Sequence, residues 1–381
     1  MPGDIRNLDT PCLLLDESRM SRNIERLNGR LRDFGVPLRP HLKTAKCVEI
    51  ARRLVASPNG PATVSTLREA EAFSAVGMTD LLYAVGIAPD KLDRVVALHR
   101  NGVDLTIVLD SVAAAEAVAA RSRAERLPIP VLIEIDSDGH RAGVRPNQQG
   151  LLLKIARTLH EGGAALRGVM THAGSSYNLH TREALAEAAE QERATAVACA
   201  ETLRQAGYPA PVVSVGSTPT AHFAHDLTGV TEVRAGTFVF FDLFMLGVGV
   251  CAIDDIAVSV LATVIGHQPD NGWILTDAGW MALSRDRGTA RQRVDQGYGL
   301  VTDLAGHPYP DLIVAETNQE QGILAMRPGS RASLPELPIG SRLRILPNHI
   351  CATAAQHDRY HVIANSGDTA VHGIWERFRG W

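Results

Sequence analysis

The sequence lacks the features typical of membrane, secreted and nucleic-acid-binding proteins. Its longest apolar stretch, residues 238–253, is interrupted by Asp242 and is shorter than the roughly 20 residues that a membrane-spanning helix needs. The five cysteines are odd in number and widely scattered, so they indicate no disulfide framework and favour a reducing cytoplasm. The N-terminal residues show no basic-then-apolar signal pattern. Lys and Arg number 38 against 42 Asp and Glu, a net charge of −4, which argues against a basic nucleic-acid-binding surface.

The sequence does have the composition of a large globular protein. Its 381 residues are 45% hydrophobic and 21% charged, close to the average for soluble proteins. Over the first 240 residues, short apolar segments alternate with helical patterns, as in sheets of parallel strands that are covered on both faces. We predict eight such strands, at residues 38–43, 63–67, 81–85, 105–110, 130–136, 166–174, 212–217 and 232–237.

The segments between these strands carry helix signals. Cys47, Ile50 and Leu54 form part of an apolar stripe at helical spacing. Asp110 is a candidate N-cap for a helix over 111–120. Residues 181–206 predict a long helix that ends near a glycine. Eight β-then-α units favour a (β/α)₈ barrel over residues 22–255, with a doubly wound sheet as the alternative, because a strand count cannot show closure.

The pattern changes after residue 255. Five strand-like segments are joined there by Gly/Pro turns without helices between them, which predicts a mostly β domain over 256–381. Residues 1–21 join the β domain, and the strand expected at 12–16 could also pair with the barrel series. The five segments are 257–265, 273–277, 312–315, 343–346 and 360–364.

Polar residues gather where the predicted barrel strands end, the edge at which such barrels carry their chemistry. Lys43 closes the first strand and is either a Schiff-base lysine with a pKa lowered by desolvation or a lysine that extends to solvent. Strands seven and eight run into small, hydroxylated, glycine-containing segments at 216–220 and 234–237. These loops are the usual phosphate position of such barrels, so together with Lys43 they suggest pyridoxal phosphate.

Two further residues at strand ends fit a flat, ring-shaped cofactor. Arg141 follows strand five and could reach a pyridine nitrogen, or else pair with Asp136 or Asp138. His172 follows strand six and could stack on the ring, or else be a hydrogen-bonded histidine of the barrel.

The β domain contains one candidate metal site. In an extended segment His349 and Cys351 point the same way, and an imidazole with a thiolate suits zinc, with two positions left for substrate or water. A chance His-x-Cys spacing is the alternative. His357 and Asp358 are either further ligands or surface loop residues.

Several motifs in combination resemble a known family. Asp9-Thr-Pro11, Arg39-Pro-His-Leu-Lys43-Thr, His172-Ala-Gly-Ser and Pro347-Asn-His349-Ile-Cys351 resemble the D-serine dehydratase and D-threonine aldolase family, whose members are pyridoxal-phosphate enzymes with an alanine-racemase-like barrel and a β domain. The similarity runs nearly end to end and is greatest to bacterial dehydratases that act on D-threo-3-hydroxyaspartate. It is also carried by the segments 134–141, 171–177, 215–220, 277–281 and 284–291.

The resemblance implies roles for individual residues. Lys43 would form the Schiff base with the cofactor and act in catalysis, and His349 and Cys351 would bind one divalent metal, Zn, Mn or Mg. The resemblance also implies a homodimer that acts on a small 3-hydroxy D-amino acid. The net charge and the short apolar stretches indicate no nucleic-acid or membrane partner. The remaining implied residues are His172 and Tyr177 in catalysis, and Arg141, His172, Ser217, Thr218, Gly236 and Thr237 in cofactor binding.

Local differences favour a dehydratase, acting on D-threo-3-hydroxyaspartate or D-serine, over an aldolase. Aldolases of the family carry His-x-Asp where this chain has His349-x-Cys351. They also have a histidine a few residues after the Gly-Ser that follows the sixth strand, whereas residues 176–178 of this chain are Ser, Tyr and Asn. Dehydration needs an acid or metal to help hydroxide leave, whereas aldol cleavage needs a base at the β-hydroxyl. His180 keeps a D-threonine aldolase as the alternative, and a non-catalytic pyridoxal-phosphate-binding protein is a third possibility.

Two features bear on substrate specificity. Relatives often have histidine where this chain has Gln321. A substrate β-carboxylate needs a cation, for which Arg285, Arg287 and Arg291 are candidates, unless they pair with Asp286 or Asp295.

Overall fold

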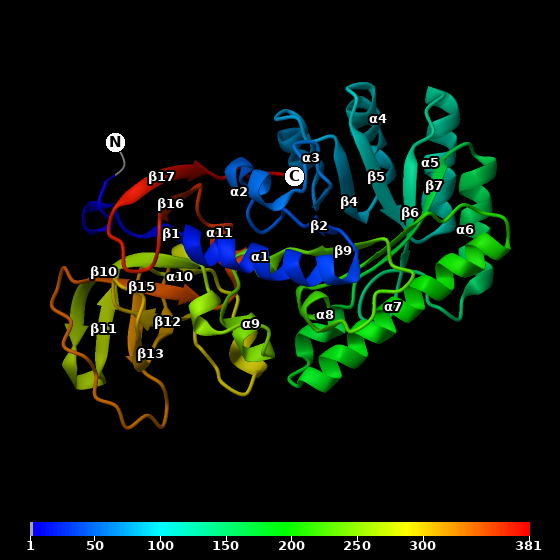
Figure 1. Ribbon diagram of the computed structural model, residues 1–381. Helices are drawn as coiled ribbons and strands as arrows, with labels where there is room; N and C mark the ends of the chain where they lie inside the picture. Colours follow the sequence, from blue (N-terminus) through cyan, green and yellow to red (C-terminus); the bar gives the residue numbers. More distant parts are fainter. Residues whose placement is uncertain (1–2) are drawn as a thin grey trace. The chain divides into compact units, whose positions relative to one another are not determined.

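The computed structural model describes residues 3–381, which form two compact units (Figure 1). One unit comprises Leu27–Gly236 and Gly380–Trp381, and the other comprises residues 3–26 and Thr237–Arg379. The boundary near the N-terminus lies within α1 (Glu17–Phe34). Within residues 3–381 no helix is both long and apolar enough to cross a membrane.

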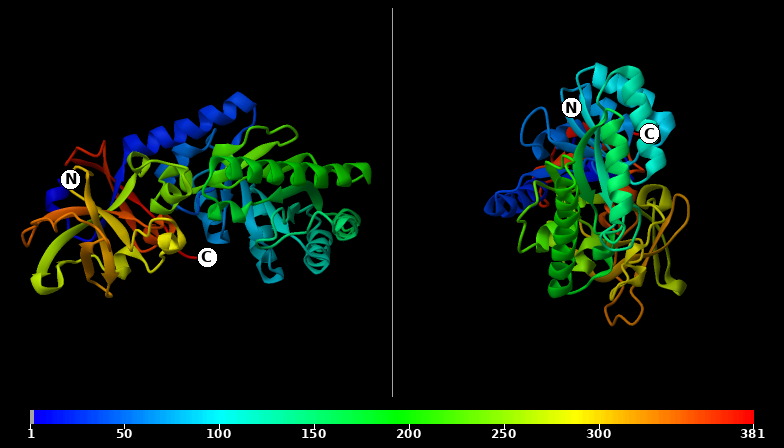
Figure 2. Two further views of the ribbon diagram at one scale, coloured as in Figure 1. Left: turned by 90° about the horizontal axis from the view of Figure 1, so that it is seen from below. Right: turned by 90° about the vertical axis from the view of Figure 1, so that its right-hand side faces the viewer.

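The first unit is a closed barrel of eight parallel strands, which confirms the predicted fold and excludes the doubly wound sheet. The strands follow the order β2-β9-β8-β7-β6-β5-β4-β3, and a parallel bridge between His41 and Thr63 joins the two ends of this series. Helices lie on the outside of the strands (Figures 1 and 2). The strands are β2 (Leu38–Pro40), β3 (Ala62–Val64), β4 (Asp80–Gly86), β5 (Asp104–Leu109), β6 (Pro130–Ile135), β7 (Ala165–Thr171), β8 (Val212–Val215) and β9 (Glu232–Ala235).

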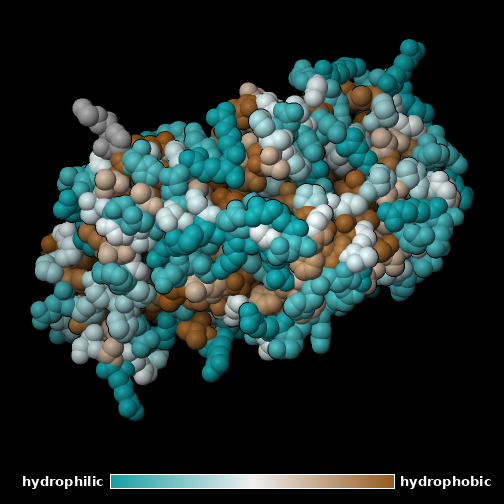
Figure 3. All heavy atoms as spheres, in the orientation of Figure 1, coloured by the Kyte–Doolittle hydropathy of each residue, from teal (hydrophilic) through white to brown (hydrophobic). Residues whose placement is uncertain are grey.

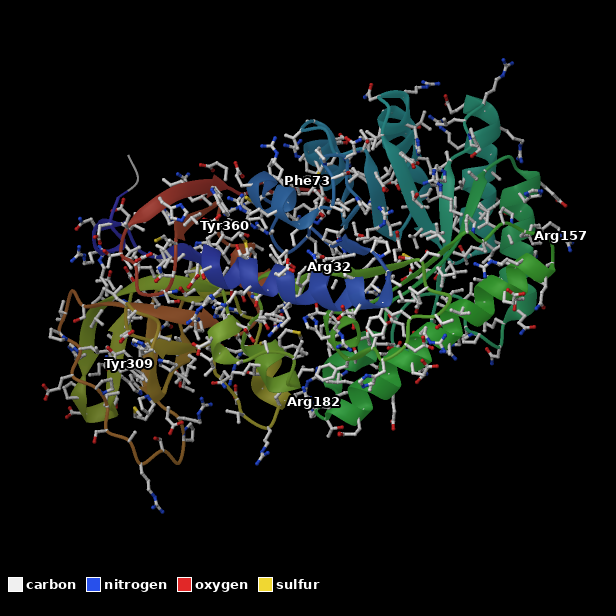
Figure 4. All side chains as sticks on the ribbon, in the orientation of Figure 1. Arg32, Phe73, Arg157, Arg182, Tyr309 and Tyr360 are labelled. Atoms are coloured by element: carbon white, nitrogen blue, oxygen red, sulfur yellow. The ribbon has the colours of Figure 1, made fainter. Side chains whose placement is uncertain are left out.

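The helices of this unit follow the strands in sequence. Residues 181–206 are helical nearly as predicted, since α7 begins after its N-cap Thr181 and ends at Gln205. Arg182 at the start of α7 lies over the ring of Phe223 in α8, with 5.8 Å between guanidinium carbon and ring centroid (Figure 4). The helices are α2 (Val48–Leu54), α3 (Leu67–Ser74), α4 (Leu92–Arg100), α5 (Val112–Glu125), α6 (Gln149–Glu161), α7 (Arg182–Gln205) and α8 (Thr218–Phe223).

Three sequence predictions in this unit were wrong in detail. The first strand ends at Pro40, and Lys43 lies in the turn 42–45 that follows it. Leu67 does not end a strand but begins α3, because the Thr66 hydroxyl caps that helix. Ser111 is the N-cap of α5, with its Oγ accepting from the backbone N–H of Ala114, while Asp110 accepts from Gly143 at 3.0 Å.

The second unit contains a nine-stranded, mostly antiparallel sheet. Its order is β11-β14-β13-β12-β15-β10-β1-β16-β17. The N-terminal strand β1 pairs antiparallel with β10 and parallel with β16, so the expected pairing with the barrel was wrong. The strands are β1 (Cys12–Asp16), β10 (Val258–Gln268), β11 (Trp273–Thr276), β12 (Gly299–Thr302), β13 (Pro308–Thr317), β14 (Gly322–Met326), β15 (Arg342–Pro347), β16 (Arg359–Ile363) and β17 (Val371–Glu376).

The sequence did not predict β12, β14 or β17, nor the helices of this unit. Both β12 and β14 are short, and β17 has an irregular burial pattern, so none of them shows a long apolar run. The unit also contains short helices at positions where the sequence predicted none or only turns, namely α9 (Leu243–Val248), α10 (Trp280–Leu283) and α11 (Ile350–Ala354).

Each unit has its own apolar core, and Phe73 on α3 and Tyr360 on β16 are among the fully buried side chains (Figure 4). Inside the barrel, Leu82, Val108, Leu132 and Met170 project from β4, β5, β6 and β7 into one buried cluster. Hydrophilic residues predominate on the outer surface around α6 (Figure 3). The barrel interior is therefore a packed core that supports the turns at its rim.

This core generates a stability prediction. We expect Leu132→Ala to lower the free energy of unfolding by about 2–5 kcal/mol, because it leaves a cavity that neighbouring strands cannot close. Urea unfolding followed by circular dichroism measures the change. Val85→Ala is the control, since this β4 side chain is 44% exposed and should change stability much less. Equal effects of the two substitutions would contradict a tightly packed barrel interior.

Candidate functional site

The turn after β2 places Lys43 at the carboxyl ends of the barrel strands. The Lys43 side chain is exposed at this rim, where its amine is accessible to a ligand. Its backbone N–H is 3.5 Å from Nδ1 of His41, whose Nε2 is 3.3 Å from Ser65 Oγ. Burial, with the positive charge of Lys43 adding to it, holds the pKa of His41 well below its usual value. The turn therefore presents one primary amine beside a neutral imidazole.

His172 follows β7 and is fixed by the neighbouring strand. Its Nδ1 lies 3.0 Å from the carbonyl oxygen of Gly216, which can only accept, so Nδ1 carries the proton. Burial lowers the pKa of His172 to about 3, so the ring is neutral and its Nε2 is an acceptor. The ring of Tyr177, in the short 3₁₀ helix Gly174–Asn178, lies 6.0 Å away between centroids. A neutral, held imidazole is suited to packing against a flat cofactor.

Arg141 lies in the loop after β6 and remains largely exposed. Its Nη2 is 3.7 Å from Oε1 of Glu134, a buried carboxyl whose pKa is raised by that burial. The carboxylates expected as its partners are engaged elsewhere: Asp136 is 3.6 Å from Arg145, and Asp138 accepts from the backbone of Ser175 at 2.7 Å. The alternative pairing of Arg141 with Asp136 or Asp138 is therefore not formed, and its exposed guanidinium is accessible to a ligand.

The turn after β8 has the features of an anion-binding loop. Ser217 caps α8, its Oγ accepting from Thr220 N–H and its own N–H donating to Thr220 Oγ1 at 3.0 Å. The Thr218 hydroxyl is buried, and among residues 3–381 no hydrogen-bond partner lies near it. Gly216 has φ +131°, and a Cβ there would lie 2.2 Å from the Arg234 carbonyl oxygen. A phosphate oxygen would supply the partner that the Thr218 hydroxyl lacks, so this loop fits the group predicted for it.

Gly236 and Thr237 follow β9, at the boundary between the two units. A Cβ at Gly236 would lie 3.0 Å from the His41 carbonyl oxygen, so a larger residue would push the two turns apart. Thr237 begins the longer segment of the second unit and is the first residue of the 3₁₀ helix Thr237–Val239. Its Oγ1 is 3.9 Å from Sγ of Cys351.

Sequence analysis missed Glu192, a buried carboxyl on α7. Its two oxygens accept hydrogen bonds from the backbone of Ala173 and Gly216 and from the Thr220 hydroxyl. A glutamate in an Ala/Glu/Arg-rich helix is typical of a solvated face. Its spacing in the helix could have identified it as buried. Glu192 lies at helical spacing in the buried stripe formed by Leu185, Ala189, Ala196 and Cys199.

The predicted metal pair lies at a helix start and not in an extended strand. β15 ends at Pro347, His349 is the N-cap residue of α11, and Cys351 lies in its first turn. His349 Nδ1 is 2.6 Å from Oδ2 of Asp286. Burial opposes the charged form of His349, but the neighbouring Cys351 sulfur and Asp286 outweigh it and raise its pKa to about 11.

The arrangement suits a metal ion even though the extended geometry was wrong. The imidazole meets the sulfur on one side and Asp286 on the other, and a histidine ligand commonly donates its second N–H to a carboxylate in this way. A cation would replace the proton that the two groups share. Among residues 3–381, however, no cluster of three or more His, Cys, Asp or Glu side chains has the geometry to hold a metal. The protein side thus supplies a two-residue pair of nitrogen and sulfur donors.

Two buried side chains fix the segment that carries this pair. Asp242 accepts from Ile350 N–H at 2.9 Å and caps α9 through Met245 N–H. Asn348 donates from Nδ2 to Thr289 Oγ1 and to the Gly297 carbonyl, both at 2.6 Å. In the sequence Asp242 was noticed only as an interruption of an apolar stretch.

The remaining candidates for metal or substrate binding differ in whether their side chains are already bonded within the protein. His357 is bonded to the Ala282 carbonyl at 3.0 Å and Asp358 to Arg359, so neither joins the metal pair. Arg287 pairs with Asp295 at 2.5 Å, as one alternative expected. The guanidinium of Arg285 instead lies over the Trp280 ring, since Asp286 is bonded to His349. Three further candidates, Arg291, His180 and Gln321, are exposed.

Comparison with known proteins confirms the resemblance. Residues 15–243 match the model of the alanine racemase N-terminal domain, and residues 257–363 match that of the "Putative serine dehydratase domain". D-threo-3-hydroxyaspartate dehydratase of Delftia sp. (strain HT23) is 55% identical over 100% of both chains. D-serine dehydratase of Dictyostelium discoideum is 32% identical over 95% of both chains, and D-threonine aldolase of Arthrobacter sp. is 29% identical over 98% of this chain and 94% of the aldolase.

Solved structures agree with this assignment. That of the Delftia sp. HT23 dehydratase superposes with a TM-score of 0.95 at 55% identity, covering 99% of this chain and 100% of the other. A cysteine-to-alanine variant of D-threo-3-hydroxyaspartate dehydratase in the metal-free form gives 0.95 at 54% identity, covering 100% of both. With both domain models matched and full-length relatives of this similarity, the chain belongs to the D-serine dehydratase and D-threonine aldolase family, whose barrel is of the alanine racemase type.

Proposed function

We propose that this chain is a dehydratase of 3-hydroxy D-amino acids that uses pyridoxal phosphate and a divalent metal, with D-threo-3-hydroxyaspartate as its preferred substrate and D-serine as a second one. The observation that carries the proposal is the 55% identity to D-threo-3-hydroxyaspartate dehydratase over the whole of both chains. The products would be a 2-oxo acid, which is oxaloacetate from hydroxyaspartate, and ammonia. The homodimer that the resemblance implies, in a reducing compartment that keeps Cys351 unoxidised, belongs to the same proposal.

In this proposal the barrel unit binds the cofactor through the residues predicted from the sequence. Lys43 Nζ anchors it and then moves the proton of the substrate Cα, and the buried Thr218 hydroxyl donates to the phosphate. Bound pyridoxal phosphate supplies an electron sink for the negative charge left at Cα. The neutral His172 would hold the ring by stacking, with Tyr177 near it, and Arg141 would interact with the ring nitrogen. Ser217, Gly236 and Thr237 complete the phosphate-binding set.

The other unit contributes the metal pair. His349 would bind a cation through Nε2 while Asp286 holds its Nδ1, and Cys351 would bind as the thiolate. A soft sulfur donor favours Zn over Mg, with Mn as the remaining candidate. A bound divalent cation supplies Lewis acidity that helps the β-hydroxyl of the substrate leave. Of the three arginines near Asp286, Arg285 and Arg291 remain the candidates for the β-carboxylate.

Product analysis tests the proposed reaction. Purified protein supplied with pyridoxal phosphate and Zn²⁺ or Mn²⁺ should release ammonia and oxaloacetate from D-threo-3-hydroxyaspartate, and a chelator should abolish this. Lys43→Ala should lower kcat by about 10²–10⁴-fold or more, because the group that moves the proton is lost. Lys154→Ala, at an exposed position of α6, is the matched control. Glycine and acetaldehyde from D-threonine, without ammonia, would identify an aldolase instead.

The contact between His349 and Asp286 predicts a metal-binding phenotype. Asp286→Ala should weaken Zn²⁺ affinity by about 10–100-fold, because the His349 imidazole loses the partner that orients it. The affinity of Asp286→Asn should lie between that of Asp286→Ala and that of the wild type. Competition with a chromophoric chelator measures this directly. Asp270→Ala, at an exposed loop position of the same unit, should leave the affinity unchanged. Equal zinc affinities of Asp286→Ala and the wild type would exclude an orienting role for Asp286.

The buried His172 predicts a pH dependence of stability. Its pKa is about 3 in the folded protein, whereas histidine in an unfolded chain titrates near 6.5. Between these values the unfolded state binds more protons, so the stability that depends on neutral His172 is complete above pH 6.5 and is lost as pH falls toward 3. His172→Asn, which can still donate to Gly216, should therefore show a shallower loss of stability between pH 6.5 and 4.

Urea unfolding across this pH range measures the slope, and His225→Asn at an exposed position is the control. The same slope in His172→Asn and in the wild type would show that His172 is not held neutral by its surroundings.

A further inference from the structure

We infer that Glu192 is a positioning residue for the cofactor phosphate: it holds the turn after β8 in the shape that leaves the Thr218 hydroxyl free, and it ties that turn to His172. The inference rests on the proposed function, since it concerns how the same loop distinguishes a phosphorylated cofactor. None of the motifs found in the sequence includes Glu192, and it makes no contact that the proposed reaction itself requires.

The geometry centres on one carboxyl group that receives three hydrogen bonds. Glu192 Oε1 accepts from Ala173 N–H at 2.9 Å and from Gly216 N–H at 3.0 Å. Its Oε2 accepts from Thr220 Oγ1 at 2.7 Å. The side chain is 2% exposed, and burial raises its pKa. Burying a carboxyl is costly unless its oxygens accept hydrogen bonds, so the three donors stabilise the buried carboxyl. The same hydrogen bonds fix the positions of the three donor groups.

These donors belong to two different turns at the barrel rim. Ala173 directly follows His172, while Gly216 and Thr220 enclose the segment that contains Ser217 and Thr218. The carbonyl of Gly216, whose N–H is bonded to Glu192, accepts in turn from His172 Nδ1. A single carboxyl thus fixes the ring-stacking candidate and the phosphate-binding candidate relative to each other.

Thr220 passes this constraint on to the phosphate loop. Its hydroxyl donates to Glu192 and accepts from the N–H of Ser217 at 3.0 Å. The Ser217 Oγ accepts from the N–H of Thr220 at 3.2 Å, which closes the capping box. The hydroxyls of Ser217 and Thr220 are therefore bonded to each other and, beyond the loop, to Ser176 Oγ and Glu192, whereas the buried Thr218 hydroxyl has no partner among residues 3–381. We assign that free hydroxyl to the cofactor phosphate.

A comparison of two ligands tests this assignment. Pyridoxal lacks the phosphate of pyridoxal phosphate, so a change in the ratio of their dissociation constants between variant and wild type isolates the effect of the variant on phosphate binding. Titration of the metal-loaded protein with each ligand, followed by the visible absorbance of the bound cofactor, gives this ratio. We expect Glu192→Gln to weaken pyridoxal phosphate binding by about tenfold or more, because one of the three donors to the Glu192 carboxyl then faces an amide N–H. Pyridoxal binding should change less than about twofold.

Glu187→Gln is the matched control, five residues earlier on α7 and exposed, and it should retain the wild-type ratio. An equal loss of affinity for both ligands would show that Glu192 only stabilises the fold and would overturn the inference, as would an unchanged ratio. A wild-type protein that binds neither ligand would refute the proposed function itself, which is a distinguishable result.

A second pair of variants covers the case in which Glu192→Gln does not fold. Thr220→Val removes the hydroxyl that links Glu192 to Ser217 while keeping the size of the side chain, and Thr220→Ser retains that hydroxyl. We expect Thr220→Val to lower the pyridoxal phosphate preference about as much as Glu192→Gln does, and Thr220→Ser to restore it. A normal ratio in Thr220→Val would overturn the inference.

Discussion

Closure of the eight parallel strands is the constraint on which the candidate site of the barrel depends. Because every strand runs in the same direction, closure brings all eight carboxyl ends to one rim, and residues as far apart in sequence as His41 and Gly236 come within contact. The bridge between His41 and Thr63 completes the ring beside the turn that carries Lys43. The strands fix the positions of the turns that follow them, and these turns carry the candidate functional side chains.

Most of the barrel could be predicted from the sequence because parallel strands are buried on both faces and form plain apolar runs. The nine-stranded sheet was predicted less completely, since strands such as β17 are exposed in part and lose that signature. Boundaries failed where a cap competes with a strand, as at Thr66 before α3. There a single hydroxyl that bonds to the helix ends the strand earlier than the apolar pattern suggests.

The sequence yields candidates where a side chain has reactive or ligating chemistry of its own, and overlooks residues whose contribution is a long-range hydrogen bond. Lys43, His172 and the pair of His349 with Cys351 have reactive or ligating groups that can be recognised from residue type and spacing. Glu192, Asp242 and Asp286 look like ordinary acidic residues in the sequence. Only the fold shows that Glu192 and Asp242 are buried and that Asp286 faces His349. Long-range hydrogen bonds of this kind leave no local pattern to recognise.

The two units determine the charge of their candidate histidines in different ways. In the barrel, burial keeps His172 neutral, and the Glu192 carboxyl is stabilised by backbone and hydroxyl donors without an ion pair among the described residues. At the metal pair, the neighbouring Cys351 and Asp286 instead favour a charged His349, so a proton occupies the place between donor groups that suits a cation. Metal binding at this proposed pair would displace that proton and would therefore be weaker at low pH. An uncharged imidazole suits packing against a flat ring, whereas a proton held between sulfur and nitrogen fits the cation proposed for this pair.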